Sequence, residues 1–358
     1  MPVRSGERWL NDAVASVLSQ TLAELELIIV DDGSSDGVAR QIEALASRDR
    51  RIRVCRQDRL GLVAALNKGL SLARAPLLAR LDADDLAHQQ RLERQVKFLA
   101  EHAGVGVVGT WTIEIDASGG HLKTRRPPCD PEALRQLLSR GNPFVHSSIM
   151  GRTELLRALG GYRAAFEAAE DYDLWLRVAE VSQLANLNET LTYYRVHSDG
   201  VSANGALRQS FSVRLAQRAA AARLAQLPDP AEYLDGPPDW RCAQDQGAFA
   251  QEIALYRSLD PTGGPPASSI SLHQFDGLNH AERRLVALSL LSHLRSTDSS
   301  QARRARTLLI NLLRQRPRAV MSAVWSLRQR LKDVRSVWSR GHRSRVMYHR
   351  RGSEADVG

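Results

Sequence analysis

Two short apolar runs in this sequence end in paired carboxylates, and these residues are the best suited to chemistry. The first run, ELELIIVDDGSSD, carries Asp31 and Asp32, and the second, RLDADD, carries Asp82, Asp84 and Asp85. A short apolar run before a turn is typical of a buried strand. Open α/β sheets bind ligands beyond their strand ends, so both motifs together indicate a site for a nucleotide and a hard metal ion. Either motif alone is also compatible with a solvated acidic turn.

A third acidic pair stands at the expected start of a helix. Glu170 and Asp171 open a segment, residues 170–181, whose other face is apolar. The helix dipole favours an ionised carboxylate at this end, where it would face a cleft. Simple capping of the helix by Asp171 is the alternative, and Asp173 is expected to be structural.

Alternating strand and helix patterns must position these acids. Apolar runs predict strands at 25–30, 52–55, 77–81, 105–109, 112–115 and 185–195. Helical spacing and capping residues predict helices at 7–19, 36–46, 61–74 and 88–101. This alternation predicts an α/β fold with a mainly parallel, Rossmann-like sheet and helices on both faces. From about residue 206 the chain is rich in Ala and Arg, and we expect a helical extension.

The sequence divides into three expected parts: a catalytic domain at 1–204, a helical extension with linkers at 205–300, and a basic tail at 301–358. The tail carries 15 Lys and Arg against 3 Asp and Glu, so it accounts for the net charge of +9. Apolar residues recur at steps of four and three from Val320 to Trp338, which predicts an amphipathic helix. Such a helix either binds an anionic membrane surface or docks on the catalytic domain. Without a recognition motif, no nucleic-acid partner is expected.

The expected compartment follows from what the sequence lacks. Cys55, Cys129 and Cys242 are far apart and form neither a CxxC pair nor a zinc spacing, which fits a reducing compartment. No apolar run reaches the roughly 18 residues of a transmembrane helix, and the N-terminus has no signal-peptide core. We therefore expect a cytoplasmic protein whose tail can lie at the inner face of the cell membrane.

Five sequence blocks resemble those of a family-two glycosyltransferase with the GT-A fold, of the bacterial surface-polysaccharide type. The blocks are ELIIVDDGSSD, ALNKGLSLARAPLLARLDADD, NPFVHSSIMGR, GGYRAAFEAAEDYDLWLR and YRVHSDGVS, within roughly the first 200 residues. The resemblance implies an inverting enzyme that moves a sugar from a nucleoside-diphosphate sugar to a hydroxyl of a glycan or lipid-linked acceptor. It also implies Mn²⁺ or Mg²⁺ as cofactor, because a divalent cation neutralises the leaving diphosphate as a Lewis acid.

The resemblance assigns roles to the strand-end carboxylates. Asp84 is the implied direct metal ligand, and Asp82 is implied to contact the ribose or the metal. Asp85 could instead cap the next helix. One of Asp31 and Asp32 is implied to bind the base of the nucleotide, and the sequence leaves open which one does so.

The resemblance also implies further site residues. Asp171, beside Glu170, is the implied general base, and such a base gives typically ~10²–10⁴-fold in rate. Asn67 and Lys68 lie on a helix that relatives place near the nucleotide.

For each of three further residues, two roles remain open. His197 is either a ligand of the metal or diphosphate or a packed residue, and Arg195 either supports the diphosphate electrostatically or is structural. His146 either contacts the acceptor or braces the structure.

The chain departs from the family pattern in two places. Leu66 stands where many relatives have Arg, and only Met1-Pro2-Val3 remains of a first strand that ends in Pro-x-Tyr-Asn-Gly in relatives. We expect that coding sequence upstream of Met1 completes this strand. Two rival functions are a nucleotidyltransferase, whose Gly-rich, Arg-containing loop the chain lacks, and a catalytically inactive glycosyltransferase-like scaffold tethered by its basic tail.

Overall fold

The computed structural model describes residues 1–4, 8–197, 206–239, 247, 249–259, 278, 283, 286, 309–310, 312–316 and 318–322. Contacts divide the chain into two compact units, Met1–Pro238 and Asp239–Gly358. The first unit extends past residue 204, where the sequence placed the end of the catalytic domain. The physical reason is that helix α9 (Ala206–Leu224) packs against helix α7 (Glu170–Val181). Helix α10 (Ala250–Leu259) belongs to the second unit.

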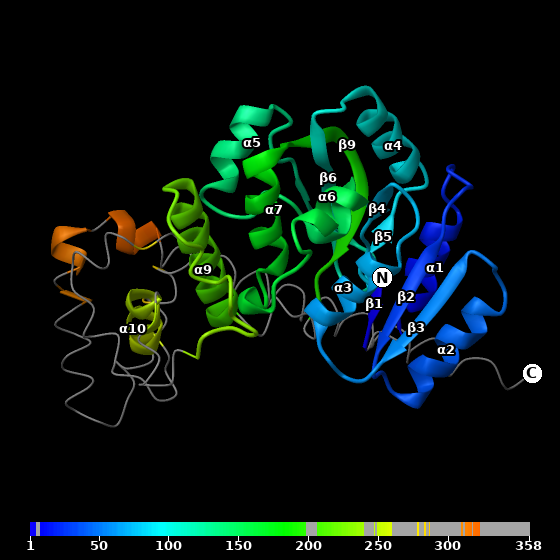
Figure 1. Cartoon of the computed structure of the whole chain (residues 1–358), viewed down its shortest axis with the longest axis horizontal. Coiled ribbons are helices and arrows are strands. Elements are labelled where there is room, and N and C mark those ends of the chain that lie inside the picture. The colour runs from blue at the N-terminus through cyan, green and yellow to red at the C-terminus, as the bar shows by residue number, and fades with distance from the viewer. Residues whose placement is uncertain are drawn as a thin grey trace, which may run out of the picture. The chain divides into compact units, whose positions relative to one another are not determined.

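A parallel sheet in the order β1–β2–β3 carries the first acidic pair (Figure 1). Its elements are β1 (Pro2–Val3), α1 (Leu10–Leu18), β2 (Leu27–Asp32), α2 (Asp36–Ala46), β3 (Ile52–Gln57) and α3 (Leu62–Leu72). Side chains alternate along β2, so Leu27 and Ile29 pack with α1 and α2, whereas Ile28 and Val30 pack with Ala65 of α3. Every residue of β2 is therefore buried, as expected for a parallel strand covered on both faces.

Pro2 and Val3 form a short strand at one edge of this sheet. Pro2 and Val3 pair with Val30 and Asp31, and the N–H of Val30 donates to the carbonyl oxygen of Met1 at 2.9 Å. A proline, which has no N–H to donate, is tolerated at such an edge position.

The second sheet of this unit is mixed. Its order is β4–β8–β6–β9–β5, with β7 paired to β6. Its strands are β4 (Leu77–Ala79), β5 (Leu86–Ala87), β6 (Val105–Ile115), β7 (His121–Arg125), β8 (Met150–Arg152) and β9 (Gln183–Arg195). Of its pairs, β6–β9 is parallel and the others are antiparallel. The α/β class is confirmed, but the expected parallel arrangement holds for the first sheet and the β6–β9 pair alone. In the second sheet β8 pairs antiparallel with β4 and β6, β5 pairs antiparallel with β9, and β7 turns back on β6 as a hairpin.

Helices cover the second sheet and lead into the site. They are α4 (Arg91–Glu101), α5 (Pro131–Leu138), α6 (Thr153–Ala158), α7 and the short 3₁₀ turns η1 (His146–Ser148) and η2 (Ala164–Phe166). Leu92 and Leu99 of α4 pack with Val105 and Val108 of β6 and with Ala185 of β9. The core thus holds β4 and β9 in fixed positions; β4 leads to the acidic loop, and β9 leads to residue 197.

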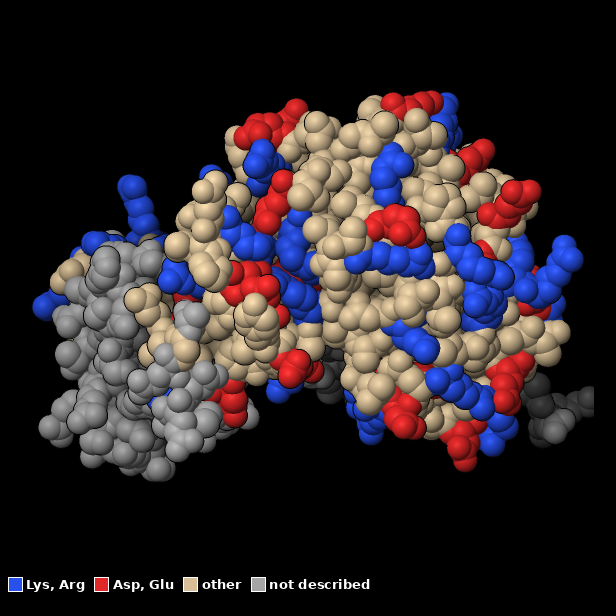
Figure 2. All heavy atoms as spheres, viewed as in Figure 1, with Lys and Arg blue, Asp and Glu red and all other residues tan. Residues whose placement is uncertain are grey.

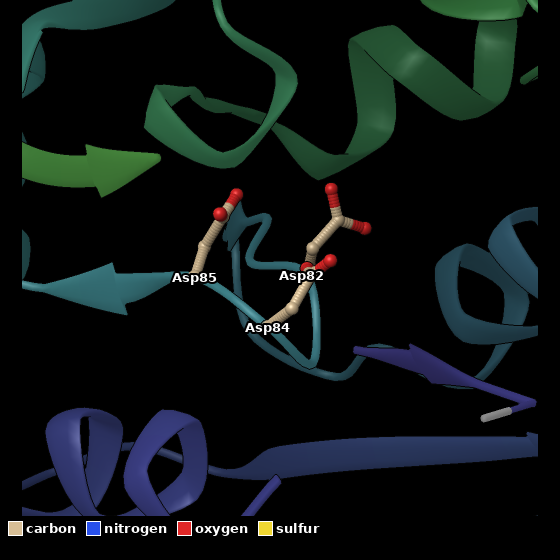
Figure 3. A group of neighbouring side chains, drawn as sticks. All are labelled: Asp82, Asp84 and Asp85. Atoms are coloured by element: carbon tan, nitrogen blue, oxygen red, sulfur yellow. The ribbon is translucent and has the colours of Figure 1, made fainter. Parts of the chain in front are cut away.

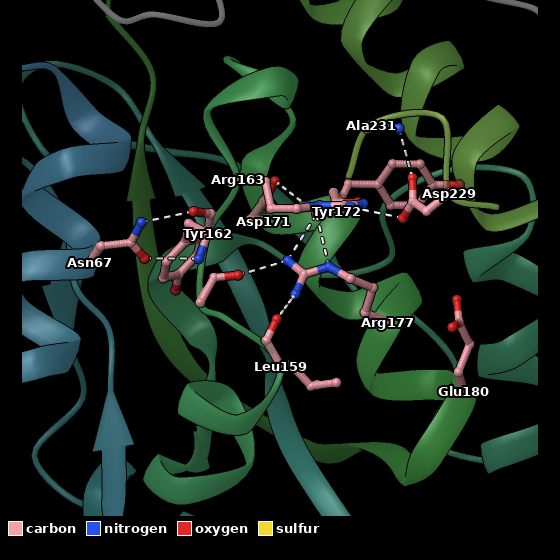
Figure 4. A network of polar contacts seen from close by, with 12 residues as sticks. Asn67, Leu159, Tyr162, Arg163, Asp171, Tyr172, Arg177, Glu180, Asp229 and Ala231 are labelled. Carbon is pink, nitrogen blue, oxygen red and sulfur yellow. Dashed lines mark hydrogen bonds and ion pairs between the residues drawn. The ribbon is translucent and has the colours of Figure 1, made fainter. Parts of the chain in front are cut away.

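A buried ionic network fastens α7 to its surroundings (Figure 4). Asp173, with no exposed side-chain surface, accepts hydrogen bonds from Arg163 and Arg177. Arg163 also pairs with Asp229 at 2.7 Å, and Arg223 pairs with the same oxygen of Asp229 at 2.7 Å. The network links α7, the segment before η2 and the end of α9, which supports the structural role expected for Asp173.

Asp173→Asn is expected to destabilise the first unit by about 3 to 5 kcal/mol, because it leaves the buried Arg177 without its counter-charge and removes one of the two carboxylates that pair with Arg163. Chemical denaturation of the full chain would measure the change. Glu43→Gln is the matched control, since its partner Arg56 and Glu43 are both exposed and such pairs contribute little. Equal stability of the Asp173 variant and the wild type would contradict the structural assignment.

The described residues include no helix that is both long and apolar enough to cross a membrane. Basic and acidic side chains are interspersed over the described part of the face in Figure 2. The tail helix expected from Val320 to Trp338 lies mostly outside the described residues, and Val320, its first apolar position, is buried. The contact of the tail with an anionic membrane and the cytoplasmic location therefore stay predictions.

Candidate active site

The loop between β4 and β5 brings three carboxylates together. Oxygens of Asp82, Asp84 and Asp85 all lie within 4.8 Å of one another, and Figure 3 shows the three side chains leaving the loop on one side. Leu81 and Ala83 are buried, whereas Asp82 and Asp84 in this turn are partly exposed. The pairing of two acids two residues apart, expected from the sequence, is therefore present.

Arg80 and Ser147 hold two of these three carboxylates. The buried guanidinium of Arg80 binds both oxygens of Asp82 and donates to Ser147 Oγ at 2.7 Å. The Ser147 hydroxyl donates to Asp85, and the backbone N–H of Arg195 donates to the other Asp85 oxygen at 2.7 Å. Burial, followed by the negative charges of Asp82 and Asp84, raises the pKa of Asp85 well above its usual value.

Asp85 does not cap the next helix, which corrects one sequence alternative. Helix α4 begins at Arg91, and its N-cap residue is Gln90. Both oxygens of Asp85 are bound by Ser147 and Arg195. This buried acid thus anchors the loop to β9 and η1.

Asp84 differs from its neighbours because its side chain contacts a histidine. His197 Nε2 lies 2.8 Å from Asp84 Oδ2, and the His197 ring packs 4.5 Å from the ring of Trp9. The second ring nitrogen, His197 Nδ1, is buried and has no hydrogen-bond partner among the described residues. The structure therefore brings together Asp84 and His197, two of the three residues that the resemblance links to a metal.

The donor set at this loop fits a divalent cation. Carboxylate oxygens of Asp82 and Asp84 are the hard ligands that Mg²⁺ and Mn²⁺ prefer, and an imidazole also suits Mn²⁺ better than Mg²⁺. The buried, unpartnered nitrogen of His197 shows that this ring is not fully satisfied by the protein. The charge of Asp82 is partly neutralised by its ion pair with Arg80. Asp84 is therefore the principal carboxylate for a cation at this loop.

Arg195 lies beside the acidic loop on β9. Its Nε donates to the carbonyl oxygen of Asp84 at 2.8 Å, and its Nη1 donates to that of Asp116 at 3.2 Å. The guanidinium also lies over the Trp9 ring, 5.3 Å from the centroid. These contacts are structural, and the contact of Arg195 with a diphosphate stays a prediction.

Asp31 and Asp32 end β2 and have different partners. Asp32 accepts from Gln57 Nε2 and from the N–H groups of Leu60 and Gly61, at 2.8, 2.8 and 3.0 Å. Both Asp32 oxygens are therefore used to hold the loop after β3. Asp31 Oδ1 accepts from Ser34, whereas its Oδ2 faces the Arg56 guanidinium at 3.7 Å.

Asn67 and Lys68 of α3, which were expected near a nucleotide, differ in their contacts and exposure. The Asn67 amide donates to the carbonyl oxygen of Tyr162 at 2.7 Å and accepts from the Tyr162 N–H at 2.8 Å. This side chain therefore holds the backbone beside Gly161, whose φ of +66° suits glycine. Lys68 is exposed on α3. A contact of either residue with a nucleotide stays a prediction.

The acidic start of α7 forms the second half of the site. Asp171 Oδ2 accepts from Asn142 Nδ2 at 2.6 Å, and its Oδ1 accepts from the Tyr172 N–H at 2.7 Å. Loss of surrounding water raises the pKa of Asp171, and these hydrogen bonds oppose the rise. Burial and then the charge of Asp171 raise the pKa of Glu170 to about 8. Asp171 is thus the member of the pair better suited to act as a base.

His146 lies next to Glu170 at the acidic start of α7. Its Nε2 lies 2.9 Å from the Tyr162 hydroxyl, and its Nδ1 lies 4.0 Å from Glu170 Oε1. Burial and the positive charge of Arg80 lower the pKa of His146 well below its usual value, so the ring is neutral. These contacts favour the bracing role for His146. A contact between His146 and the acceptor stays a prediction.

Sequence reasoning missed four residues of this site: Arg80, Asn142, Ser147 and Tyr162. Asn142 and Ser147 stand in the block NPFVHSSIMGR, and Arg80 directly precedes the RLDADD acids. The available signal was Arg80, a charged residue directly after the apolar run at 75–79. Apart from Asp82, which Arg80 binds two positions away, their partners lie far away in sequence, so the signal did not indicate what they bind.

Comparisons with known proteins show which family the chain resembles. The family described as Glycosyl transferase family 2 matches residues 1–160. EpsE of Bacillus subtilis (strain 168) is 38% identical over 204 residues, which cover 56% of this chain and 72% of the relative. The O-antigen biosynthesis glycosyltransferase WbnJ of Escherichia coli is 29% identical over 202 residues, with 55% and 78% covered.

A solved structure shares the fold at low identity. It is Staphylococcus aureus TarS, residues 1–349, in complex with UDP-GlcNAc, with a TM-score of 0.52 and 15% identity. The match covers 92% of this chain and 90% of that one. This chain belongs to Glycosyl transferase family 2 and has the GT-A fold. It is a glycosyltransferase with a nucleotide-sugar donor, as the resemblance implied.

Proposed function

We propose that this chain is an inverting, metal-dependent transferase that moves a sugar from a nucleoside-diphosphate sugar to a hydroxyl of a glycan or lipid-linked acceptor. The observation that supports this most is the position of Arg80 between two acidic groups. Arg80 binds Asp82 of the acidic loop and donates to Ser147 of η1, and His146 of the same turn lies 4.0 Å from Glu170 on α7. The positive charge of Arg80 also opposes the rise in the pKa values of Glu170 and Asp171 that burial causes. The carboxylates suited to a metal ion and the acidic pair that holds the proposed base are therefore connected through Arg80 and η1.

The proposed proton acceptor is Asp171. The acceptor oxygen attacks the anomeric carbon while its proton passes to the Asp171 carboxylate. The bond from that carbon to the diphosphate oxygen breaks, and its electron pair leaves with the diphosphate. Attack opposite the leaving group inverts the anomeric configuration, and Glu170 remains beside the base as a neutral group below pH of about 8.

The proposed metal ligands are Asp84, Asp82 and His197. A bound Mn²⁺ or Mg²⁺ would supply Lewis acidity at the departing diphosphate oxygen. Ser147 and Arg80 keep the loop in the geometry that presents Asp84. The orphaned His197 nitrogen and the 2.8 Å contact between Asp84 and His197 support this choice.

The nucleotide is proposed to lie at the end of β2. Asp31 is the better candidate for contact with the base, because both oxygens of Asp32 already hold the loop at 57–61. A relative named for O-antigen biosynthesis supports a role in cell-surface polysaccharide assembly for this chain as well. Mn²⁺, Asn67, Lys68 and Arg195 complete the proposed donor site.

A panel of nucleotide sugars tests this function. We expect one nucleotide class to raise the melting temperature of the full chain in the presence of Mn²⁺, because a ligand that binds only the folded state stabilises it. The same donor should be hydrolysed slowly, and EDTA should remove both effects. Stabilisation without any turnover would favour the inactive scaffold, and no stabilisation by any donor would contradict the proposed function.

A further inference from the structure

The orientation of the Asp171 carboxylate is set from outside its own helix. Asn142 lies in the segment between α5 and η1, and its amide donates to Asp171 Oδ2 at 2.6 Å. On the helix side, the Tyr172 N–H donates to Oδ1 at 2.7 Å. The two donors bind different oxygens, so together they fix the plane of the carboxylate.

The Asn142 amide has only one orientation that satisfies its neighbours. Its Oδ1 accepts the N–H of Phe144 at 3.1 Å, so its NH₂ group is directed to Asp171. Phe144 is buried and packs edge-on against Trp175 of α7, with ring centroids 6.1 Å apart. The segment that carries Asn142 is therefore held against the same helix that carries Asp171.

The Asn142 amide affects the ionisation of Asp171 because of the charges and the burial around this carboxylate. Glu170 on the same helix adds negative charge, Arg80 next to the acidic loop adds positive charge, and Tyr162 from the segment before η2 is neutral because burial raises its pKa. Burial raises the pKa of Asp171, and the Asn142 hydrogen bond opposes that rise most strongly. Hydrogen bonds to ionised groups are the stronger ones.

We propose that Asn142 is a positioning residue, which holds the Asp171 carboxylate ionised and oriented to take the proton of the acceptor hydroxyl. This inference rests on the proposed function, because it gives Asn142 a task only if Asp171 is the base. Asn142 acts through Asp171 and needs no contact with the reacting atoms.

Asn142→Asp separates this role from a structural one. An aspartate can still accept the N–H of Phe144, so the local turn is kept. It cannot donate to Asp171 when ionised, and it adds a second negative charge at the same place. A purely structural Asn142 therefore predicts the larger defect for Asn142→Ala, which loses the contact with the Phe144 N–H. The positioning role predicts the larger defect for Asn142→Asp.

Hydrolysis of the donor found in the panel gives the kinetic readout. We expect Asn142→Ala to lower kcat at neutral pH by about 10- to 100-fold, the effect of losing one hydrogen bond to an ionised group. The acidic limb of the pH profile should move to higher pH, and further for Asn142→Asp. Donor affinity should stay within about two-fold. Asn11→Ala, which removes an exposed amide contact to Gln41, is the control and should change none of these quantities.

A titration without turnover gives the second readout. In the full chain labelled with ¹³C at aspartate carboxyl carbons, the Asp171 signal is assigned by its loss in Asp171→Asn. We expect its pKa to rise in Asn142→Ala and further in Asn142→Asp. Unchanged kcat, acidic limb and Asp171 pKa in both variants, with Asp171→Asn inactive, would overturn the positioning role alone. Full activity of Asp171→Asn would instead overturn the proposed base.

Discussion

Asp84→Ala is expected to abolish metal-dependent transfer while leaving the fold intact. A bound metal ion contributes several kcal/mol to the stabilisation of the departing charge. Each 1.36 kcal/mol is a factor of ten in rate, so the loss should be roughly 10³-fold or more. The fold should persist because the Asp84 side chain is about one-third exposed and the loop is anchored by Asp82 and Asp85 instead. Steady-state hydrolysis of the donor at saturating Mn²⁺ measures the change.

Asp12→Ala is the control for this variant, because Asp12 is an exposed acid on α1. Its kcat and its dependence on Mn²⁺ should match the wild type. The unfolding temperature of Asp84→Ala without metal should also stay close to the wild-type value. Near-wild-type turnover of Asp84→Ala at saturating Mn²⁺ would show that the metal site lies elsewhere.

Asp171→Asn should keep donor binding and lose turnover by about 10²- to 10⁴-fold, the usual contribution of a general base. An asparagine has the same shape and can still accept the Tyr172 N–H, so the start of α7 should be kept. It cannot take up the acceptor proton. Donor affinity from calorimetry and kcat from hydrolysis should therefore separate.

The pattern of losses distinguishes the base from a helix cap. A cap has a structural task, so its removal would weaken donor binding, stability and turnover together. Glu167→Gln, an exposed acid shortly before α7 that pairs with Arg208, is the control and should change turnover little. A parallel loss of donor affinity and turnover in Asp171→Asn would make Asp171 a structural residue.

The sequence predicted local features well where the signal was local. The apolar run before Asp31 became the buried strand β2, and the RLDADD motif became a loop with its acids gathered on one side. Helix α7 begins at Glu170, as its acidic start and apolar face indicated. Each of these features depends on neighbouring residues, so period and composition suffice to predict it.

Features that depend on distant partners could not be predicted in the same way. Ser147 reaches Asp85 across 62 positions, and Asn67 reaches Tyr162 across 95. Nothing in the spacing near either residue specifies such a partner. The mixed character of the second sheet has the same origin, because the pairing of β8 with both β4 and β6 is set by packing far along the chain. The different tasks of Asp31 and Asp32 likewise follow from the loop at 57–61.

One calorimetric experiment tests the central claim most directly: titration of the panel donor into the wild type, Asp84→Ala and Asp171→Asn, each with and without Mn²⁺. We predict that Mn²⁺ strengthens donor binding to the wild type and to Asp171→Asn, and that Asp84→Ala shows the weak, metal-free affinity under both conditions. A donor that binds all three proteins equally, with or without Mn²⁺, would contradict a nucleotide-sugar site built on the acidic loop.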